Sequence, residues 1–190
     1  PPTMSRQDGG NPRSLLWLAA LVYTAFVIYG SLVPLEFRAM PWNEAVAKFG
    51  SMPFLKLGIG SRADWMANLL LFIPLTYLWM GALTAGGSRL RGGLATLVLV
   101  PVAALLSIGI EFTQLFFPQR TVSQNDILAE ALGGLIGVLA WWAAGSRFVD
   151  WLLSWQQTHA RAALAERLAW VYLVGVLVYN VLPLDLTISL

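Results

Sequence analysis

Acidic and amide side chains occur in closely spaced pairs at the edges of long apolar segments. Six such residues form three pairs at a spacing of three or four: Asp64 with Asn68, Glu111 with Gln114, and Asp126 with Glu130. Residues at this spacing lie on the same face of a helix. Carboxylates close to arginine could bind a lipid head group, a phosphate or a hard cation such as Mg²⁺. Two acids in a partly dry environment could instead serve as general acid and general base.

Other familiar chemistries find little support in the sequence. The chain has no cysteine and one histidine, His159, which lies far along the chain from the pairs. A Ser/His or Cys/His nucleophile system is therefore not expected. The Gly-rich stretch GGSRLRGG lacks the spacing of a phosphate-binding P-loop. We assign no catalytic residue, no metal ligand and no cofactor, and whether the protein is an enzyme stays open.

The composition indicates a membrane protein. Hydrophobic residues make up 57% of the 190 residues and charged residues 12%, and the mean hydropathy is +0.66. Soluble domains carry about 25% charged residues. Nine tryptophans and five tyrosines suit the aromatic belt at a membrane interface. The formal charge of +2 is too small to indicate a nucleic-acid partner, so membrane lipids are the expected surroundings.

The elements that must position the pairs are apolar segments. Their lengths are close to the roughly 20 residues that a helix needs to cross a membrane. Five are expected to span, at residues 15–33, 65–85, 94–116, 127–144 and 168–183. The apolar spacing of PWNEAVAKF, residues 41–49, predicts a short amphipathic helix on the membrane surface. Gly133 and Gly137 form a GxxxG pair, which favours close helix packing and is weaker evidence for dimerisation. The expected fold is all-α, a polytopic transmembrane helical bundle with short amphipathic interfacial helices.

The segments divide the chain into four regions. We expect a disordered tail at 1–14, a membrane domain of four helices at 15–145, an amphipathic connector at 146–166 and a fifth span within 167–190. Because the chain opens with PPTM and stops just after a hydrophobic segment, we expect it to be a piece of a longer protein. The stretches 22–37 and 171–186 both end in Pro-Leu-acid. Either they begin two copies of a repeat, or Pro and an acid are simply a common way to leave a membrane.

Arginine and lysine counts predict which way the chain crosses the membrane. With a cytoplasmic N-terminus, the inner segments hold seven basic residues and the outer segments five: Arg6, Arg13, Arg89, Arg91, Arg147, Arg161 and Arg167 against Arg38, Lys48, Lys56, Arg62 and Arg120. That bias favours the N-terminus inside. The three polar pairs, Arg38 and Arg120 would then share the outer side. Such residues can also just cap helices or meet water, and Asp126 could cap the fourth span.

Two stretches resemble the VanZ-like family. DWMANLLLFIPL, residues 64–75, is similar to that family's D-x-x-x-N-x-x-x-F-x-P-L segment. IEFTQLFFPQRTVSQNDILAEALGGLIG, residues 110–137, is similar to its block of E-x-x-Q, Pro-x-Arg, Ser, Asp and a Gly-rich helix. The resemblance implies a multi-pass protein of the bacterial plasma membrane, related to one associated with teicoplanin resistance. The positions that it carries over are Asp64, Asn68, Glu111, Gln114, Arg120, Ser123 and Asp126. The family usually has Asn where this chain has Glu130.

Together these observations favour a binding protein. The first hypothesis is that the polar cluster, with Arg38 and Glu130 added, binds an envelope lipid, a lipid-linked glycan or a lipoglycopeptide at the extracytoplasmic face and lowers glycopeptide susceptibility. A second is a membrane enzyme that acts on a lipid-linked substrate with Glu111 and Asp126 as acid and base. A third is an assembly subunit for exopolysaccharide export. The oligomeric state is left open.

Overall fold

The computed structural model describes residues 12–54, 59–159, 172–173 and 176. Within them the chain forms helices and connecting turns, without a strand. The helices are α1 (Pro12–Leu32), α2 (Trp42–Gly50), α3 (Ile59–Thr84), α4 (Arg89–Gln114) and α5 (Gln124–His159). The predicted helical membrane bundle is confirmed. The tail at 1–11, most of the predicted fifth span and most of the second Pro-Leu-acid stretch lie outside the described residues.

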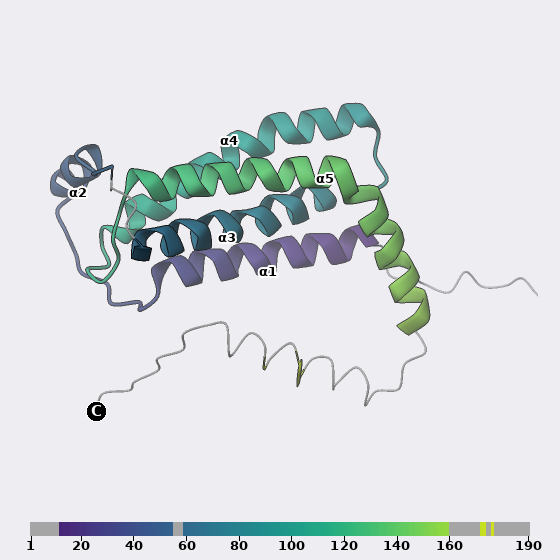
Figure 1. Cartoon of the computed structure of the whole chain (residues 1–190), viewed down its shortest axis with the longest axis horizontal. Coiled ribbons are helices and arrows are strands. Elements are labelled where there is room, and N and C mark those ends of the chain that lie inside the picture. The colour runs from purple at the N-terminus through teal and green to yellow at the C-terminus, as the bar shows by residue number, and fades with distance from the viewer. Residues whose placement is uncertain (1–11, 55–58, 160–171, 174–175, 177–190) are drawn as a thin grey trace, which may run out of the picture.

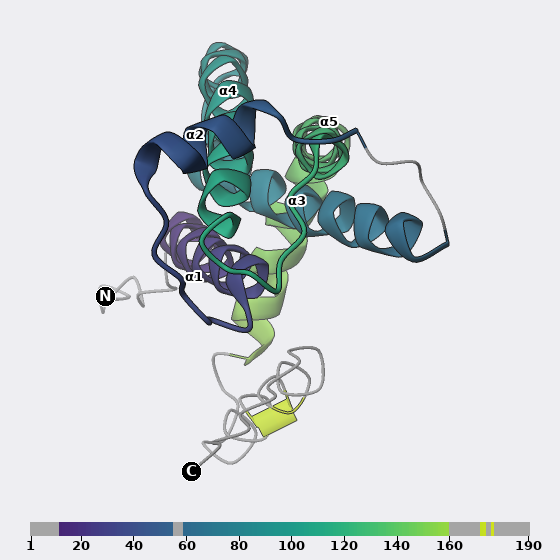
Figure 2. The same cartoon turned by 90° about the vertical axis from the view of Figure 1, so that its left-hand side faces the viewer.

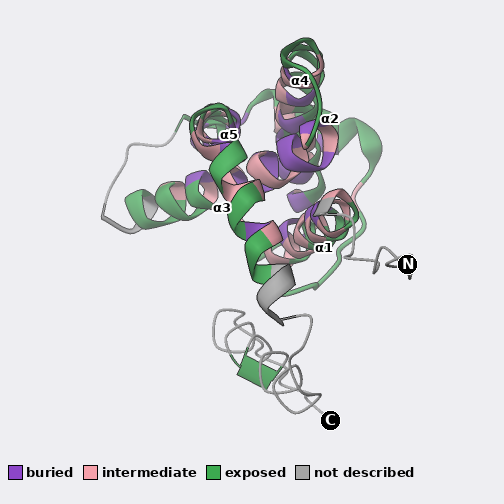
Figure 3. Cartoon of the chain, turned by 90° about the vertical axis from the view of Figure 1, so that its right-hand side faces the viewer, coloured by how far each residue is buried: buried purple, intermediate pink, exposed green. Residues whose placement is uncertain are grey.

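Four helices have the length and apolar composition to cross a membrane. The candidate spans are Arg13–Leu32, Arg62–Thr84, Arg89–Gln114 and Gln124–Trp155, and each overlaps one of the first four predicted spans. Figure 1 shows the four helices side by side along the long axis of the molecule. Figure 3 shows buried residues on their inward faces and many exposed residues outside. Leu97 and Leu105, for example, are 72% and 66% exposed, as expected for side chains that face lipid.

Helix α3 lies at the centre of the bundle and packs most extensively against α5. The GxxxG pair makes this contact, because a Cβ at Gly133 would overlap the backbone oxygen of Leu69, and one at Gly137 the backbone oxygen of Ile73. The Thr76 hydroxyl then donates to the Gly134 carbonyl oxygen across the same interface, at 2.8 Å. Small residues and interhelical hydrogen bonds hold helices together where lipid provides no hydrophobic driving force. The GxxxG pair therefore joins two helices of one chain.

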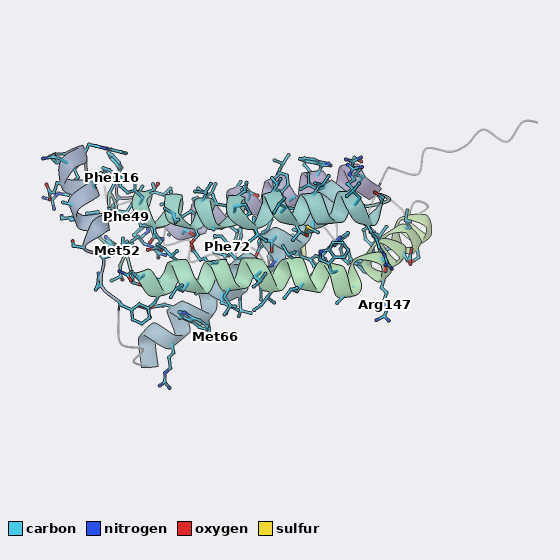
Figure 4. The ribbon with its side chains drawn as sticks, turned by 90° about the horizontal axis from the view of Figure 1, so that it is seen from above. Phe49, Met52, Met66, Phe72, Phe116 and Arg147 are labelled. Carbon is cyan, nitrogen blue, oxygen red and sulfur yellow. The ribbon has the colours of Figure 1, made fainter. Side chains whose placement is uncertain are left out.

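Three clusters of buried side chains fill the bundle from one end to the other. Val27, Phe72, Leu75 and Ile110 join α1, α3 and α4, and Figure 4 shows Phe72 well inside. A second cluster is Met80, Leu99, Val138 and Trp141, and a third is Leu16, Ala20, Ala82 and Leu152. One hydrogen bond also joins α3 to α1: the Trp79 indole N–H donates to the Thr24 hydroxyl at 2.9 Å. The interior is thus mainly apolar, which makes any buried acid unusual.

Helix α5 is longer than the sequence pattern suggested. The fourth span was expected to end at Ala144, yet the helix continues without a break to His159. Figure 1 shows that it changes direction at the end of the bundle. Gly145 and Ser146 lie in this region, and Gly/Ser pairs are frequent sites of helix kinks. Beyond the bend Leu152 is buried against α1 and α3 while Trp151 is 56% exposed, so the expected amphipathic segment packs partly on the bundle.

The predicted amphipathic helix is present as α2, and it lies across one end of the bundle (Figure 2). Ala45 is fully buried, while Glu44 and Lys48 form an exposed ion pair of 3.0 Å. Trp42 and Phe49 contact the ring of Phe112, with centroids 5.1 and 5.4 Å away. These contacts fix α2 beside the end of α4, where the candidate site lies.

Candidate functional site

Four of the predicted residues form a hydrogen-bonded chain at the end of the bundle near α2. We call them the carboxylate network: Asn68 of α3, Glu111 of α4, Ser123 of the α4–α5 turn and Asp126 of α5. The Asn68 amide donates to Asp126 Oδ1 at 2.9 Å, and the Ser123 hydroxyl donates to Asp126 Oδ2 at 2.6 Å. The Ser123 backbone N–H donates to Glu111 Oε2 at 3.2 Å. Three helices are therefore linked through two carboxylates.

The start of α5 explains how Asp126 is held. Ser123 is the residue before the helix, and its hydroxyl also accepts from the Asp126 backbone N–H at 3.3 Å. This is the usual arrangement of a serine N-cap. Asp126 is therefore in the first turn and does not itself provide the cap, as the sequence had left open. A carboxylate in the first turn is stabilised by the helix dipole.

Gln114 and Arg38 lie close by but make different contacts. The buried Gln114 amide donates to the Ser31 carbonyl oxygen at 2.9 Å, which fastens the end of α4 to the end of α1. The Arg38 backbone N–H donates to the Phe116 carbonyl oxygen at 2.7 Å, and its side chain is exposed. Both residues hold the loop after α1 near the site. Neither side chain joins the carboxylate network.

Asp64 does not join the network either. Its side chain is exposed and makes no hydrogen bond or ion pair with another described residue. Figures 2 and 3 show the first turns of α3 projecting away from the other helices. Asn68, one turn further on, is the first residue of this face to reach α5. The predicted pair is thus divided: Asp64 faces solvent or lipid head groups, whereas Asn68 faces the bundle.

Glu130 lies one helical turn below Asp126, in the interior. It is 1% exposed, and its Oε2 atom has no hydrogen-bond partner among the described residues. The Ser107 hydroxyl of α4 lies close to this carboxyl but is also without a partner of good geometry. Glu111 and Asp126 are near enough to act on Glu130 electrostatically. Such a buried acid is costly in a membrane interior, where charged residues usually mark a function.

Arg120 is the cation that acts on this group of acids. It is half-buried in the α4–α5 turn and interacts electrostatically with both Glu111 and Glu130. The described residues contain no ion pair between Arg120 and these acids. Two of the three carboxyl groups, those of Glu111 and Glu130, thus lie near one guanidinium. The described part of the chain has no group of three acidic, histidine or cysteine side chains placed to hold a metal ion.

Two participants were not anticipated from the sequence. Ser107 precedes Glu111 by four residues, so its position on the same helix face could have been found by the spacing argument. The second is Gln124, whose side chain donates to the Met52 carbonyl oxygen at 2.9 Å. Figure 4 shows Met52 with Phe49 at the α2 end of the molecule. No local signal connects residues 52 and 124, because the contact depends on how α2 is seated.

Comparison with known proteins adds the family. Searches of curated proteins and of solved structures found no match. A family model described as VanZ/LLP1 matches residues 14–149, and the matched region contains most of α1, all of α2 to α4, most of α5 and every residue of the carboxylate network. Because that region is well over half of the 190 residues, the chain belongs to the VanZ/LLP1 family.

Proposed function

We propose that this VanZ/LLP1 protein binds the polar head of an envelope lipid or of a lipid-linked glycan at the α2 end of its bundle. The observation that carries the proposal is the carboxylate network, which fixes Asp126 by two side-chain hydrogen bonds, while the half-buried Arg120 acts electrostatically on Glu111 of the same network. Polar groups held in a fixed arrangement at the end of apolar helices suit an amphipathic ligand, whose acyl or prenyl chain can stay in the lipid.

The burial of the site residues indicates which of them position the site and which contact a ligand. Glu111 and Ser123 are each 1% exposed and are suited to positioning the first turn of α5. Asp126 and Arg120 are half-buried and are suited to contact a ligand. A carboxylate accepts hydrogen bonds from sugar hydroxyls or amines, and a guanidinium pairs with phosphate. A glycan joined to its lipid by phosphate carries both kinds of group.

The distribution of arginines supports placing this site at the extracytoplasmic face. Arg13, Arg89, Arg91 and Arg147 lie at the opposite end of the bundle, where the tight turn between α3 and α4 is followed by two arginines and no acid. The site end has four described basic residues as well, Arg38, Lys48, Arg62 and Arg120, but they are mixed with acids. An excess of arginine marks cytoplasmic ends of membrane helices. With that end inside, the carboxylate network faces the compartment where glycopeptide antibiotics meet lipid-linked glycans. Lower susceptibility to a teicoplanin-like antibiotic is the consequence that we propose for cells.

The test is a binding measurement on the full chain in nanodiscs. The probe is a fluorescent disaccharide linked to a polyprenyl chain by diphosphate. We expect Asp126→Asn and Arg120→Ala each to weaken binding about tenfold or more, since hydrogen bonds to charged groups contribute about 1.5–3 kcal/mol. Matched controls are Glu44→Gln and Lys48→Ala, an exposed acid and cation at the same end of the molecule. Equal affinities for all four variants and the parent would refute the proposal.

A further inference from the structure

A second site is suggested by a cleft at the other end of the bundle. It has a volume of about 390 Å³ and lies between the α3–α4 turn and α5. Ser88, Arg89 and Gly92 line it on one side, and Trp141, Trp142 and Ser146 on the other. Small-molecule pockets are typically about 300–1,000 Å³. The cleft is therefore large enough for a small polar group, and none of its residues belongs to the carboxylate network.

The backbone explains why space remains there. Gly86 has a φ of +71°, a conformation that favours glycine, and it lets the chain turn back tightly from α3 into α4. Gly92 also keeps the cleft open, because a Cβ there would meet the ring of Trp142. On the far side, Figure 4 shows Arg147 where α5 changes direction. The cleft thus depends on a tight turn, a missing side chain and a bent helix.

The charge around the cleft is predominantly positive. Arg89 lines it, and the side chain of Arg91 packs against Gly87 at its edge. Arg147 is exposed nearby on α5. Asp150 is the acidic residue among those that line the cleft. The first turn of α4 adds the positive end of a helix dipole. An anion is therefore the complementary ligand.

The surroundings of the cleft indicate a lipid source for that anion. Trp142 is 48% exposed and donates from Nε1 to the Thr96 hydroxyl at 3.0 Å, and tryptophan is enriched at the membrane interface. Trp142 lines the cleft, and from it an apolar stripe runs along the same face of α5 towards the bundle centre. Its residues Leu139 and Leu135 precede Trp142 by three and seven positions and are 57% and 44% exposed. This stripe would accommodate the acyl chains of a molecule whose head lies in the cleft.

We propose that this cleft binds the phosphate of an anionic phospholipid from the adjacent leaflet. Arg89 provides the main charge-assisted hydrogen bonds to the phosphate, with Arg91 at the rim. Trp142 holds the glycerol region at the interface, and the acyl chains lie along the Leu139 and Leu135 face of α5. The site is separate from the proposed glycan site, so either one can fail without the other.

The experiment counts retained lipid by native mass spectrometry of the full chain released from micelles. Phosphatidylglycerol, phosphatidylcholine and inorganic phosphate are titrated separately. We expect preferential binding of one phosphatidylglycerol, and about a tenfold loss of affinity in Arg89→Ala. Ser146→Trp, which keeps Arg89 but fills the exposed mouth of the cleft, should lose binding as well. Arg62→Ala removes an exposed arginine from the opposite end and should bind normally.

Three results would overturn the proposal. The first is unchanged phosphatidylglycerol binding in both Arg89→Ala and Ser146→Trp. The second is an equal loss in Arg62→Ala, which would show that any surface arginine contributes alike. The third is competition by inorganic phosphate at the same concentration as the lipid, which would show that the acyl chains contribute nothing and that the ligand is a free anion.

Discussion

Two neighbouring glycines should respond in opposite ways to the same substitution. A Cβ at Gly133 would overlap the Leu69 carbonyl oxygen and lie 3.2 Å from the Leu69 Cα. Those atoms belong to the backbone of α3 and cannot rotate aside. A Cβ at Gly134 would lie 3.4 Å from the Thr76 methyl group and 3.6 Å from the Ala103 Cβ, which is ordinary contact. Only Gly133→Ala forces α3 and α5 apart.

The expected size of the difference follows from two opposing effects. Replacing glycine by alanine within a helix stabilises it by roughly 0.5–1 kcal/mol. Overpacking a tight interior costs typically about 1–3 kcal/mol. Gly134→Ala should therefore raise the free energy of unfolding, and Gly133→Ala should lower it. Because both variants share the same helix-propensity gain, the difference between them measures the overlap and should be about 1–3 kcal/mol.

The assay is unfolding by SDS in mixed micelles, followed by tryptophan fluorescence. Gly109→Ala is the third variant, because among the described residues no atom outside its own helix backbone lies within 4 Å of its Cβ position, so it reports the helix-propensity effect alone. The reasoning fails if Gly133→Ala is as stable as Gly134→Ala. In that case α3 and α5 do not approach as closely as the GxxxG pair requires, and the register that places Asn68 beside Asp126 is also wrong.

Three further substitutions test the interior. Glu130→Gln should keep or raise the melting temperature of the detergent-solubilised protein, because a neutral amide removes the cost of a buried carboxylate whose Oε2 has no partner in the described part of the chain; a large drop would show that the carboxylate has a strong partner. Ser123→Ala should lower the free energy of SDS unfolding by about 1 kcal/mol through loss of the N-cap, with an unchanged value contradicting the cap. Phe72→Ala, at a fully buried position, should cost about 3–5 kcal/mol in the same titration, and a cost below 1 kcal/mol would be inconsistent with the described core.

The sequence by itself determined the class of fold and the location of most elements. In a membrane the backbone must satisfy its own hydrogen bonds, so each long apolar segment becomes a helix whatever its neighbours are. The spans that contain Phe72 and Ser107, and the short helix at Trp42, could therefore be identified locally. Spacing along each helix likewise assigned the polar residues to faces, as with Asp126 and Glu130. These inferences needed no knowledge of which helices are in contact.

Only the tertiary structure decided which faces meet. Spacing alone paired Asn68 with Asp64, yet Asn68 bonds to Asp126 while Asp64 stays exposed. The GxxxG motif signalled close packing, and the fold selected α3 of the same chain as its partner. Asp126 obtains its partners from α3 and the turn, while Glu130, one turn deeper, retains an oxygen that bonds to none of the described residues. The physical reason is that helix periodicity is a short-range property, whereas contacts between helices depend on tilt, register and side-chain fit across segments far apart in the chain.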